Sequence, residues 1–189
     1  MIIFYGPTGA GKSLQGQFLA MRHGWKWLSM GQVLRDTNDP EILAIMKTGQ
    51  MVPHETTNNV ISTVLTGDRM CSEKGGAVLD GYPRDVEQAQ FLIDHENRRC
   101  GNNNIDLVIV IDMAKDEIMR RLALRGRAED DTETIEYRLR LYDEQTGPIL
   151  TYFQEIGVSI EHIDGVGTVG EVHDRIEDAL ESRGIAGAF

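Results

Sequence analysis

The sequence has few cysteines, little positive charge and no long apolar run, and each shortage excludes a class of protein. Its two cysteines, Cys71 and Cys100, do not form a Cys-x-x-Cys pair. They therefore predict neither a zinc site nor a disulfide framework. A chain without such a framework is expected in a reducing compartment, and we predict a cytoplasmic location on this ground.

Positive charge is the second shortage. Lys and Arg number 19 against 30 Asp and Glu, which gives a net charge of −11. A surface this acidic repels nucleic acid and anionic membranes, so neither is a predicted partner. No apolar run approaches the roughly 18 residues of a membrane-spanning helix, and no charged leader precedes an apolar stretch. We therefore expect neither a membrane span nor a secretion signal.

The pattern of apolar residues predicts a single α/β domain. The length of 189 residues suits one domain, because chains of this size bury roughly 70% of their unfolded surface. Expected strands cover residues 2–5, 26–29, 77–80, 107–112 and 158–163, and expected helices cover 12–23, 31–36, 40–48, 55–74, 85–97, 115–125, 131–155 and 169–182. This alternation indicates a parallel sheet with helices on both faces. Residues 30–58 and the arginine-rich stretch 121–131 are interpreted as inserts.

Residues 6–13, with the sequence GPTGAGKS, form a glycine-rich phosphate-binding motif. The motif follows an apolar strand and opens a helix, which is the context it requires. In such a loop, glycines let the backbone N–H groups turn toward phosphate oxygens, and the helix N-terminus adds partial positive charge. Lys12 is expected to reach the outer phosphates and Ser13 to ligate Mg²⁺. The motif therefore predicts binding of a nucleoside triphosphate.

Asp80 ends the buried segment 77–80 and is expected near this loop, because parallel sheets place ligand groups at the carboxyl ends of their strands. There it can hold Mg²⁺ through water and complete the metal shell that Ser13 begins. The alternative is a turn residue that caps the next segment. Arg84 follows a Gly-Tyr-Pro turn and is expected to face the phosphate loop.

Arginine is concentrated in one later region of this acidic chain. The residues are Arg120, Arg121, Arg125, Arg127 and Arg138. Phosphoryl transfer needs cations along the path of the moving group, because its charge is spread over the equatorial oxygens. Guanidinium groups serve this purpose, since they are permanently charged and bind phosphate in a bidentate way. The alternative is a solvated helix face paired with acidic residues at 129–131 and 133.

Several motifs in one order make the sequence resemble the adenylate kinase family over nearly the whole chain. They are residues 6–15, 28–35, 49–53, 79–84 with Gln88, 125–127 and 142–148. The resemblance implies a P-loop nucleotide kinase fold whose five parallel strands have the order 2-3-1-4-5. It implies one domain over residues 1–189, with an acceptor-binding insert at 30–58 and a short lid at 121–131. The lid lacks the four-cysteine metal site that some relatives carry, so no zinc is expected. Mg²⁺ is expected together with ATP.

The resemblance also implies roles for individual residues. ATP is expected on Gly9, Ala10, Gly11, Lys12, Ser13 and Leu14, with Arg121 stacked on the adenine and Gly167 in backbone contact. AMP is expected beside Met30, Arg35, Gln50, Met51, Val52, Gly81, Tyr82, Pro83, Arg84, Gln88, Arg127 and Arg138. The expected catalytic residues are Lys12, Arg84, Arg125, Arg127 and Arg138, and the metal ligands are Ser13 and, through water, Asp80. The resemblance further implies a cis peptide bond between Tyr82 and Pro83.

These assignments predict a monomeric enzyme that transfers the γ-phosphoryl group of ATP to AMP and gives two ADP. Two other functions stay open: a UMP or CMP (pyrimidine) monophosphate kinase on the same scaffold, and a nucleotide-binding regulatory module without turnover. Gln88 favours AMP, because it lies one helical turn after Arg84 and its amide offers a donor and an acceptor to the base edge of adenine. Met30 stands where the family usually has Thr, which removes one polar contact to the acceptor. Retention of Arg35, Arg84, Gln88 and Arg138 counts against the regulatory module, because a switch has no use for an acceptor site.

Overall fold

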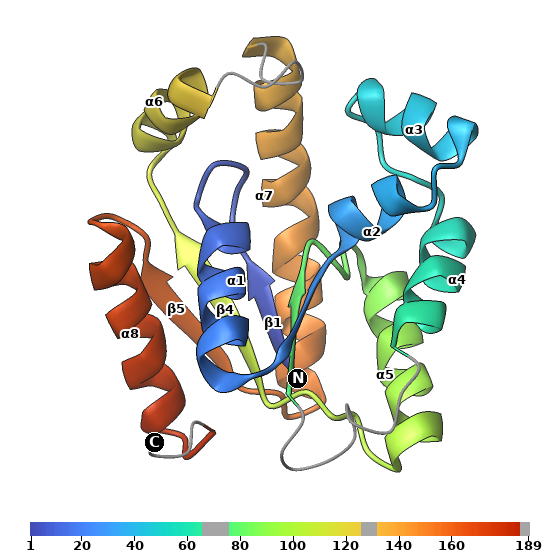
Figure 1. Ribbon diagram of the computed structural model, residues 1–189, viewed down its shortest axis with the longest axis vertical. Helices are drawn as coiled ribbons and strands as arrows, with labels where there is room; N and C mark the ends of the chain where they lie inside the picture. Colours follow the sequence, from blue (N-terminus) through green and yellow to red (C-terminus); the bar gives the residue numbers. More distant parts are fainter. Residues whose placement is uncertain (66–75, 126–131, 186–189) are drawn as a thin grey trace.

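The computed structural model describes residues 1–65, 76–125 and 132–185, without the side chain of Arg125. Its strands are β1 (Ile2–Tyr5), β2 (Lys26–Ser29), β3 (Ala77–Asp80), β4 (Leu107–Asp112) and β5 (Ile160–Asp164). Its helices are α1 (Lys12–His23), α2 (Met30–Asp36), α3 (Pro40–Lys47), α4 (His54–Val64), α5 (Val86–Cys100), α6 (Lys115–Arg125), α7 (Thr132–Glu155) and α8 (Val169–Glu181). Strands and helices alternate along most of this part of the chain (Figure 1), as the apolar pattern predicts.

The five strands form one sheet in the order β2-β3-β1-β4-β5, and each neighbouring pair is parallel. The order implied by the family resemblance is therefore confirmed. Because all strands run the same way, their carboxyl ends meet at one edge of the sheet. Asp80 at the end of β3 lies opposite Phe4 on one side and Ser29 on the other. This edge gathers the loop after β1, Asp80 and the start of α2.

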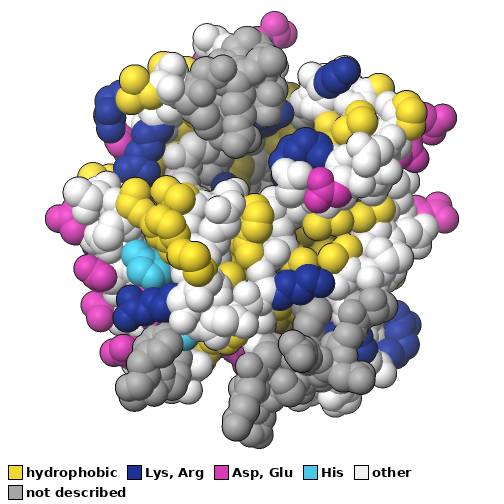
Figure 2. Space-filling view, viewed as in Figure 1, with side chains coloured by type: hydrophobic (Ala, Val, Ile, Leu, Met, Phe, Trp, Pro, Cys, Tyr) yellow, Lys and Arg dark blue, Asp and Glu magenta, His cyan; other side chains and the backbone are white. Residues whose placement is uncertain are grey.

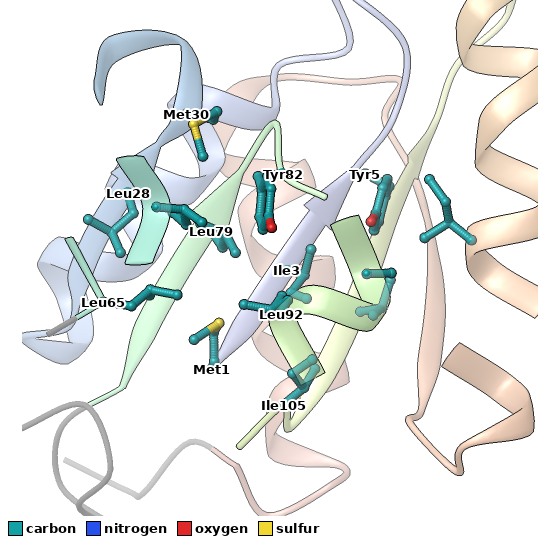
Figure 3. Packing of buried hydrophobic residues seen from close by; sticks show 14 of the residues in the cluster. Met1, Ile3, Tyr5, Leu28, Met30, Leu65, Leu79, Tyr82, Leu92 and Ile105 are labelled. Carbon is teal, nitrogen blue, oxygen red and sulfur yellow. The ribbon is translucent and has the colours of Figure 1, made fainter. Parts of the chain in front are cut away.

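Each face of the sheet is covered by its own helices. Ile2 and Phe4 of β1 pack in one apolar cluster with residues of α1 and α8, while Ile3 and Tyr5 pack in another with residues of α5 and α7. Figure 3 shows the second cluster, where Leu92 of α5 lies over β1. This alternation is expected for a central strand buried on both faces. Burial of each large apolar side chain contributes about 1.5–3 kcal/mol to folding.

The insert between β2 and β3 begins with two short helices. Asp39 is the N-cap of α3, and its side chain accepts hydrogen bonds from the backbone N–H groups of Glu41 and Ile42. Pro40 occupies the first turn, where its missing N–H is not needed. Gly49, with φ of 75°, ends the turn after α3 in a left-handed conformation that favours glycine. The chain then reaches α4, which lies beside α5 (Figure 1).

Most predicted boundaries differ from the structure by only one to three residues, and the largest differences have local causes. The fifth strand, predicted at 158–163, covers Ile160–Asp164, because Val158 packs in the core before the chain joins the sheet. Of the helix predicted at 55–74, residues from His54 to Val64 are helical, and residues 66–75 lie outside the described ranges. The predicted cis peptide bond between Tyr82 and Pro83 is confirmed.

The cysteine prediction is corrected by the structure. Cys100, at the end of α5, is disulfide-bonded, whereas the spacing of the two cysteines predicts no disulfide. Spacing fails here because one disulfide bond needs no local cysteine motif. Cys71 lies outside the described residues. The cytoplasmic location stays a prediction.

None of the helices in the described ranges combines the length and the apolar character that a membrane span requires.

The junction of β4 and β5 gives a test of the packing. A Cβ atom at Gly165 would lie 2.6 Å from Ile111 Cγ2 and 2.9 Å from the carbonyl oxygen of Asp112. We expect Gly165→Ala to lower the free energy of unfolding by about 1–3 kcal/mol, because this space cannot hold a methyl group. Urea denaturation measures the change. The matched control is Gly170→Ala in α8, where a Cβ atom meets nothing within 4 Å; equal effects at both sites would contradict the close packing.

Candidate active site

The phosphate-binding loop leaves β1 after Tyr5 and enters α1 at Lys12. Gly9 and Gly11 have φ of 84° and 96°, values that favour glycine over other residues. Gly11 is the N-cap of α1, and no side chain caps this helix. The first N–H groups of a helix lack partners within it, so they can bind an anion.

Other residues of the loop that are expected to bind ATP lie around the same turn. Lys12 Nζ donates to the carbonyl oxygen atoms of Gly6 (2.6 Å) and Pro7 (2.8 Å). Its ammonium group is therefore held over the loop, where an anion would bind. Ala10 is buried, whereas Leu14 on the first turn of α1 is 41% exposed.

Ser13 and Asp80 are brought together across the loop. Ser13 Oγ donates to Asp80 Oδ2 over 2.5 Å, and Asp80 is 4% exposed. Asp80 thus pairs with the phosphate loop and does not act as the helix cap of the alternative interpretation, since Asp85 is the N-cap of the next helix. A hydroxyl and a carboxylate are hard oxygen ligands of the kind that Mg²⁺ prefers, and Mg²⁺ commonly takes its other ligands from phosphates and water. The two residues therefore fit the predicted metal.

A second cationic site lies beside Asp80. Arg84 Nε donates to the carbonyl oxygen of Gly81 over 3.0 Å, which fixes the direction of the side chain. The pKa of the Arg84 guanidinium is lowered, first by its partial removal from water and then by the nearby positive charge of Arg138, while Asp80 opposes both effects. Two guanidinium groups that repel each other, with no carboxylate bonded to either among the described residues, are a site for an anion.

The first turns of α7 bring Arg138 to the insert. The Nε and Nη2 atoms of Arg138 lie 3.8 Å from where a Cβ atom of Gly49 would stand. Thr134, one turn earlier, would lie 3.0 Å from the same point. The predicted acceptor segment that follows Gly49 therefore starts against the helix that carries Arg138.

Gln88 makes hydrogen bonds within the protein that the sequence does not predict. Its side chain is buried, with 1% exposure, and its Oε1 accepts a hydrogen bond of 2.8 Å from the backbone N–H of Arg84. Its own backbone N–H donates to Asp85 Oδ1, and its carbonyl oxygen accepts from the Tyr82 hydroxyl. Gln88 thus orients the turn that presents Arg84. Its Nε2 has no hydrogen-bond partner within the described ranges and can donate to a ligand.

Met30 does not offer a polar contact to a ligand. Its side chain is 2% exposed and packs in the apolar cluster with Leu28 and Leu79 (Figure 3). Arg35, at the end of α2, is exposed and donates to Gln32 Oε1 over 3.2 and 3.4 Å. The charge of Arg35 is therefore accessible to a ligand, whereas Met30 is buried.

The segment Gln50 to Val52 borders a hollow between the insert and α7. The cavity measures about 450 Å³ and is lined by Gln50, Met51, Val52, Pro53, His54, Tyr137, Leu141 and Gln145. Gly81, with φ of 77°, precedes the buried Tyr82, whose hydroxyl donates to Asn58 of α4. In Figure 2 the surface is hollowed between the part built from α2 and α3 and the part built from α6, and Lys and Arg side chains lie along this hollow. A further cavity, of about 440 Å³, touches the phosphate loop only at Pro7.

The predicted adenine side of the donor site is assembled from α6 and the loop after β5. Arg121 Nη2 donates to the carbonyl oxygen of Gly165 over 3.1 Å. Gly167, two residues on, has φ of 131°. Arg121 therefore contacts the loop that carries Gly167, and their shared role stays a prediction. Arg127 lies outside the described residues, as does the side chain of Arg125.

Glu117 is a residue of this region that the sequence interpretation missed. Its carboxylate accepts from Arg120 Nε (2.7 Å) and Nη2 (2.8 Å) and from Arg121 Nε (2.7 Å). The ion-pair alternative therefore holds for Arg120, whose side chain is 62% exposed, with a different partner from those expected. The spacing of three and four residues on one helix was the available signal.

Comparison with known protein families matches residues 4–158 to the family described as adenylate kinase. An adenylate kinase of Mycobacterium marinum is 35% identical over 185 residues, which cover 95% of this chain and 98% of that protein. An adenylate kinase of Leifsonia xyli is 36% identical over 194 residues, or 97% of this chain and 94% of that protein. One of Synechococcus is 33% identical over 185 residues, or 95% and 97%.

The arginine contacts of Glu117 lead to a testable pKa. Hydrogen bonds from Arg120 first and Arg121 second lower the pKa of Glu117 from 4.5 to about 2. A folded-state pKa below the unfolded value means that the stabilisation is present above about pH 4.5 and is lost as the pH falls toward 2. We expect the carboxyl carbon of Glu117 to titrate near pH 2 by NMR. Arg120→Gln should move the midpoint upward, and an unshifted wild-type midpoint would contradict the pairing.

Proposed function

Because the chain belongs to the adenylate kinase family, we propose that it transfers the γ-phosphoryl group of ATP to AMP and gives two molecules of ADP. The observation that carries this proposal is the pair of adjacent anion sites: the glycine loop with Lys12 and Ser13, and the two arginines Arg84 and Arg138 beside Asp80. A transfer between two nucleotides needs two such sites, whereas a nucleotide switch needs one. Both are built by one chain, so we propose that a monomer is active.

On the donor side, the loop would hold the triphosphate of ATP. The uncapped N–H groups at the start of α1 point at its oxygens, and Lys12 would leave the carbonyls of Gly6 and Pro7 to reach the outer phosphates. Arg121, together with Gly167, would hold the adenine. Mg²⁺, when held by Ser13 and Asp80, neutralises charge that develops on the phosphate oxygens.

On the acceptor side, Arg84, Arg138 and Arg35 would bind the phosphate of AMP. Gln88 would read the adenine with its free amide donor while its carbonyl oxygen keeps Arg84 in place. Residues Gln50 to Val52 would close over the base from the insert. Met30 would contribute apolar packing beneath the ribose or base.

The chemistry needs no general base of unusual pKa, because the attacking phosphate oxygen of AMP is already anionic. The arginines hold donor and acceptor in line and stabilise the charge spread over the equatorial oxygens of the transferred group. Water has to be kept out, since it would otherwise take the phosphoryl group. We therefore propose that the insert at 30–58 and the short lid at 121–131 close when both nucleotides bind.

Arg84→Ala and Arg138→Ala test the phosphoryl path. Each is expected to lower kcat/KM by about a hundredfold or more, because loss of one preorganised donor costs ~10²–10³ in rate. The melting temperature should hardly change, since neither guanidinium has a carboxylate partner in the described part of the chain. The matched control is Arg120→Ala, which removes an exposed arginine paired with Glu117 and should alter kcat/KM less than twofold. Large losses of stability with intact turnover would mean that Arg84 and Arg138 are structural.

A coupled assay with ATP against AMP, CMP, UMP and GMP tests the acceptor. We expect AMP to have the highest kcat/KM. Gln88→Glu keeps an oxygen that accepts from Arg84 but removes the amide donor, so it should lower kcat/KM for AMP at least tenfold, a loss of about one hydrogen bond. CMP or UMP equal to AMP in the wild type would replace this assignment with a pyrimidine nucleotide kinase. ATP binding without transfer to any of the four would indicate a regulatory module.

A further inference from the structure

The N-terminal turns of α4 contact the segment that presents Arg84 and Gln88. His54 and Asn58 lie one turn apart on the same face of this helix. Asn58 Oδ1 accepts a hydrogen bond of 2.7 Å from the Tyr82 hydroxyl. His54 Nε2 lies 3.2 Å from Asp85 Oδ2, and His54 Nδ1 lies 3.0 Å from Glu87 Oε2. These contacts join the insert to the start of α5, which lies beside α4 in Figure 1.

The two residues that His54 contacts lie between two residues of the proposed acceptor site in the sequence. Asp85 directly follows Arg84, and Glu87 directly precedes Gln88. Asp85 is also the N-cap of α5, and its Oδ1 accepts from the backbone N–H of Gln88. The position of Asp85 therefore affects the positions of Arg84 and Gln88. His54 itself directly follows the segment at 50–53.

The two contacts of His54 differ in environment. Asp85 Oδ2 is buried and has no hydrogen-bond partner in the described ranges, although His54 Nε2 lies 3.2 Å away. A small rotation of the imidazole would direct a proton on Nε2 at this oxygen and satisfy a buried acceptor, which is costly to leave unpaired. Glu87 is 80% exposed, so its contact is screened by water. The contact with Asp85 is therefore the stronger candidate for an effect.

We propose that His54 is a positioning residue for the acceptor nucleotide. Through Asp85 it holds the acceptor segment of the insert in register with the turn that carries Arg84 and Gln88. This inference rests on the proposed function, because it takes the region between the two segments to be the AMP site. His54 touches neither nucleotide in this role, and the donor site lies on other elements, so only acceptor binding should depend on it.

Three variants of His54 separate positioning from a general structural role. His54→Ala removes both contacts and should raise KM and Kd for AMP about fivefold, as expected for a partly exposed polar contact. KM for ATP and kcat should change less than twofold. His54→Gln places an amide N–H where Nε2 stood and should restore most of the AMP affinity. His54→Asn places it where Nδ1 stood, toward Glu87, and should restore little.

The matched control is His162→Ala. His162 is also an exposed histidine paired with a carboxylate, with Nδ1 2.9 Å from Asp112 Oδ2, but it lies on β5. This variant should leave KM and Kd for AMP unchanged. Melting temperatures of all four variants show whether any change in affinity comes from unfolding.

The outcomes distinguish this inference from the proposed function. Wild-type turnover of AMP with unchanged AMP affinity in His54→Ala, or an equal rise in KM for ATP and AMP, would overturn the role of His54 alone. Failure of His54→Gln to restore any affinity would do the same. If the wild type bound AMP without turning it over, the proposed reaction would fail, and the Kd values from calorimetry would still decide the role of His54. Absence of AMP binding would overturn both.

Discussion

The position of β1 fixes both halves of the candidate site. This strand has four residues, all buried, and it pairs with β3 on one edge and β4 on the other. It cannot shift by one residue without moving Ile2 and Phe4 away from their helices. The chain leaves it directly into the phosphate-binding loop. At its last residue, the Tyr5 hydroxyl donates to the carbonyl oxygen of Pro83 over 2.8 Å, so the same strand end also anchors the turn that carries Arg84.

Much of this fold could be predicted from the sequence, because its three central strands, β1, β3 and β4, are buried on both faces. A strand of that kind is a short run of apolar residues bounded by turn residues, and the runs at 2–5, 77–80 and 107–112 agree with β1, β3 and β4. The edge strand β5 is half exposed, so its apolar pattern is weaker and its predicted start was two residues early. Strand order does not follow from such patterns; it came from the family resemblance.

The candidate site was predictable to the extent that its residues lie in local motifs. The glycine loop and the Ser13 and Asp80 pair follow from spacing and from the geometry of parallel strands. Contacts between distant segments leave no such pattern. The burial of Met30 against Leu28, the hydrogen bond from Arg84 to Gln88 and the contact of His54 with Asp85 depend on how the insert packs, which no sequence period encodes.

The two proposed nucleotide sites are therefore held in place by different physical means. The donor loop is fixed by backbone geometry: glycines in left-handed conformations join a buried strand to a helix packed on the sheet. The proposed acceptor site is assembled from side chains on the insert, the turn after β3 and α7, and the insert is proposed to close over the ligand. The contacts of His54 with Asp85 and of Asn58 with Tyr82 join the insert to the chain that follows β3. We therefore expect changes in α4 to alter acceptor affinity and to leave donor binding unchanged.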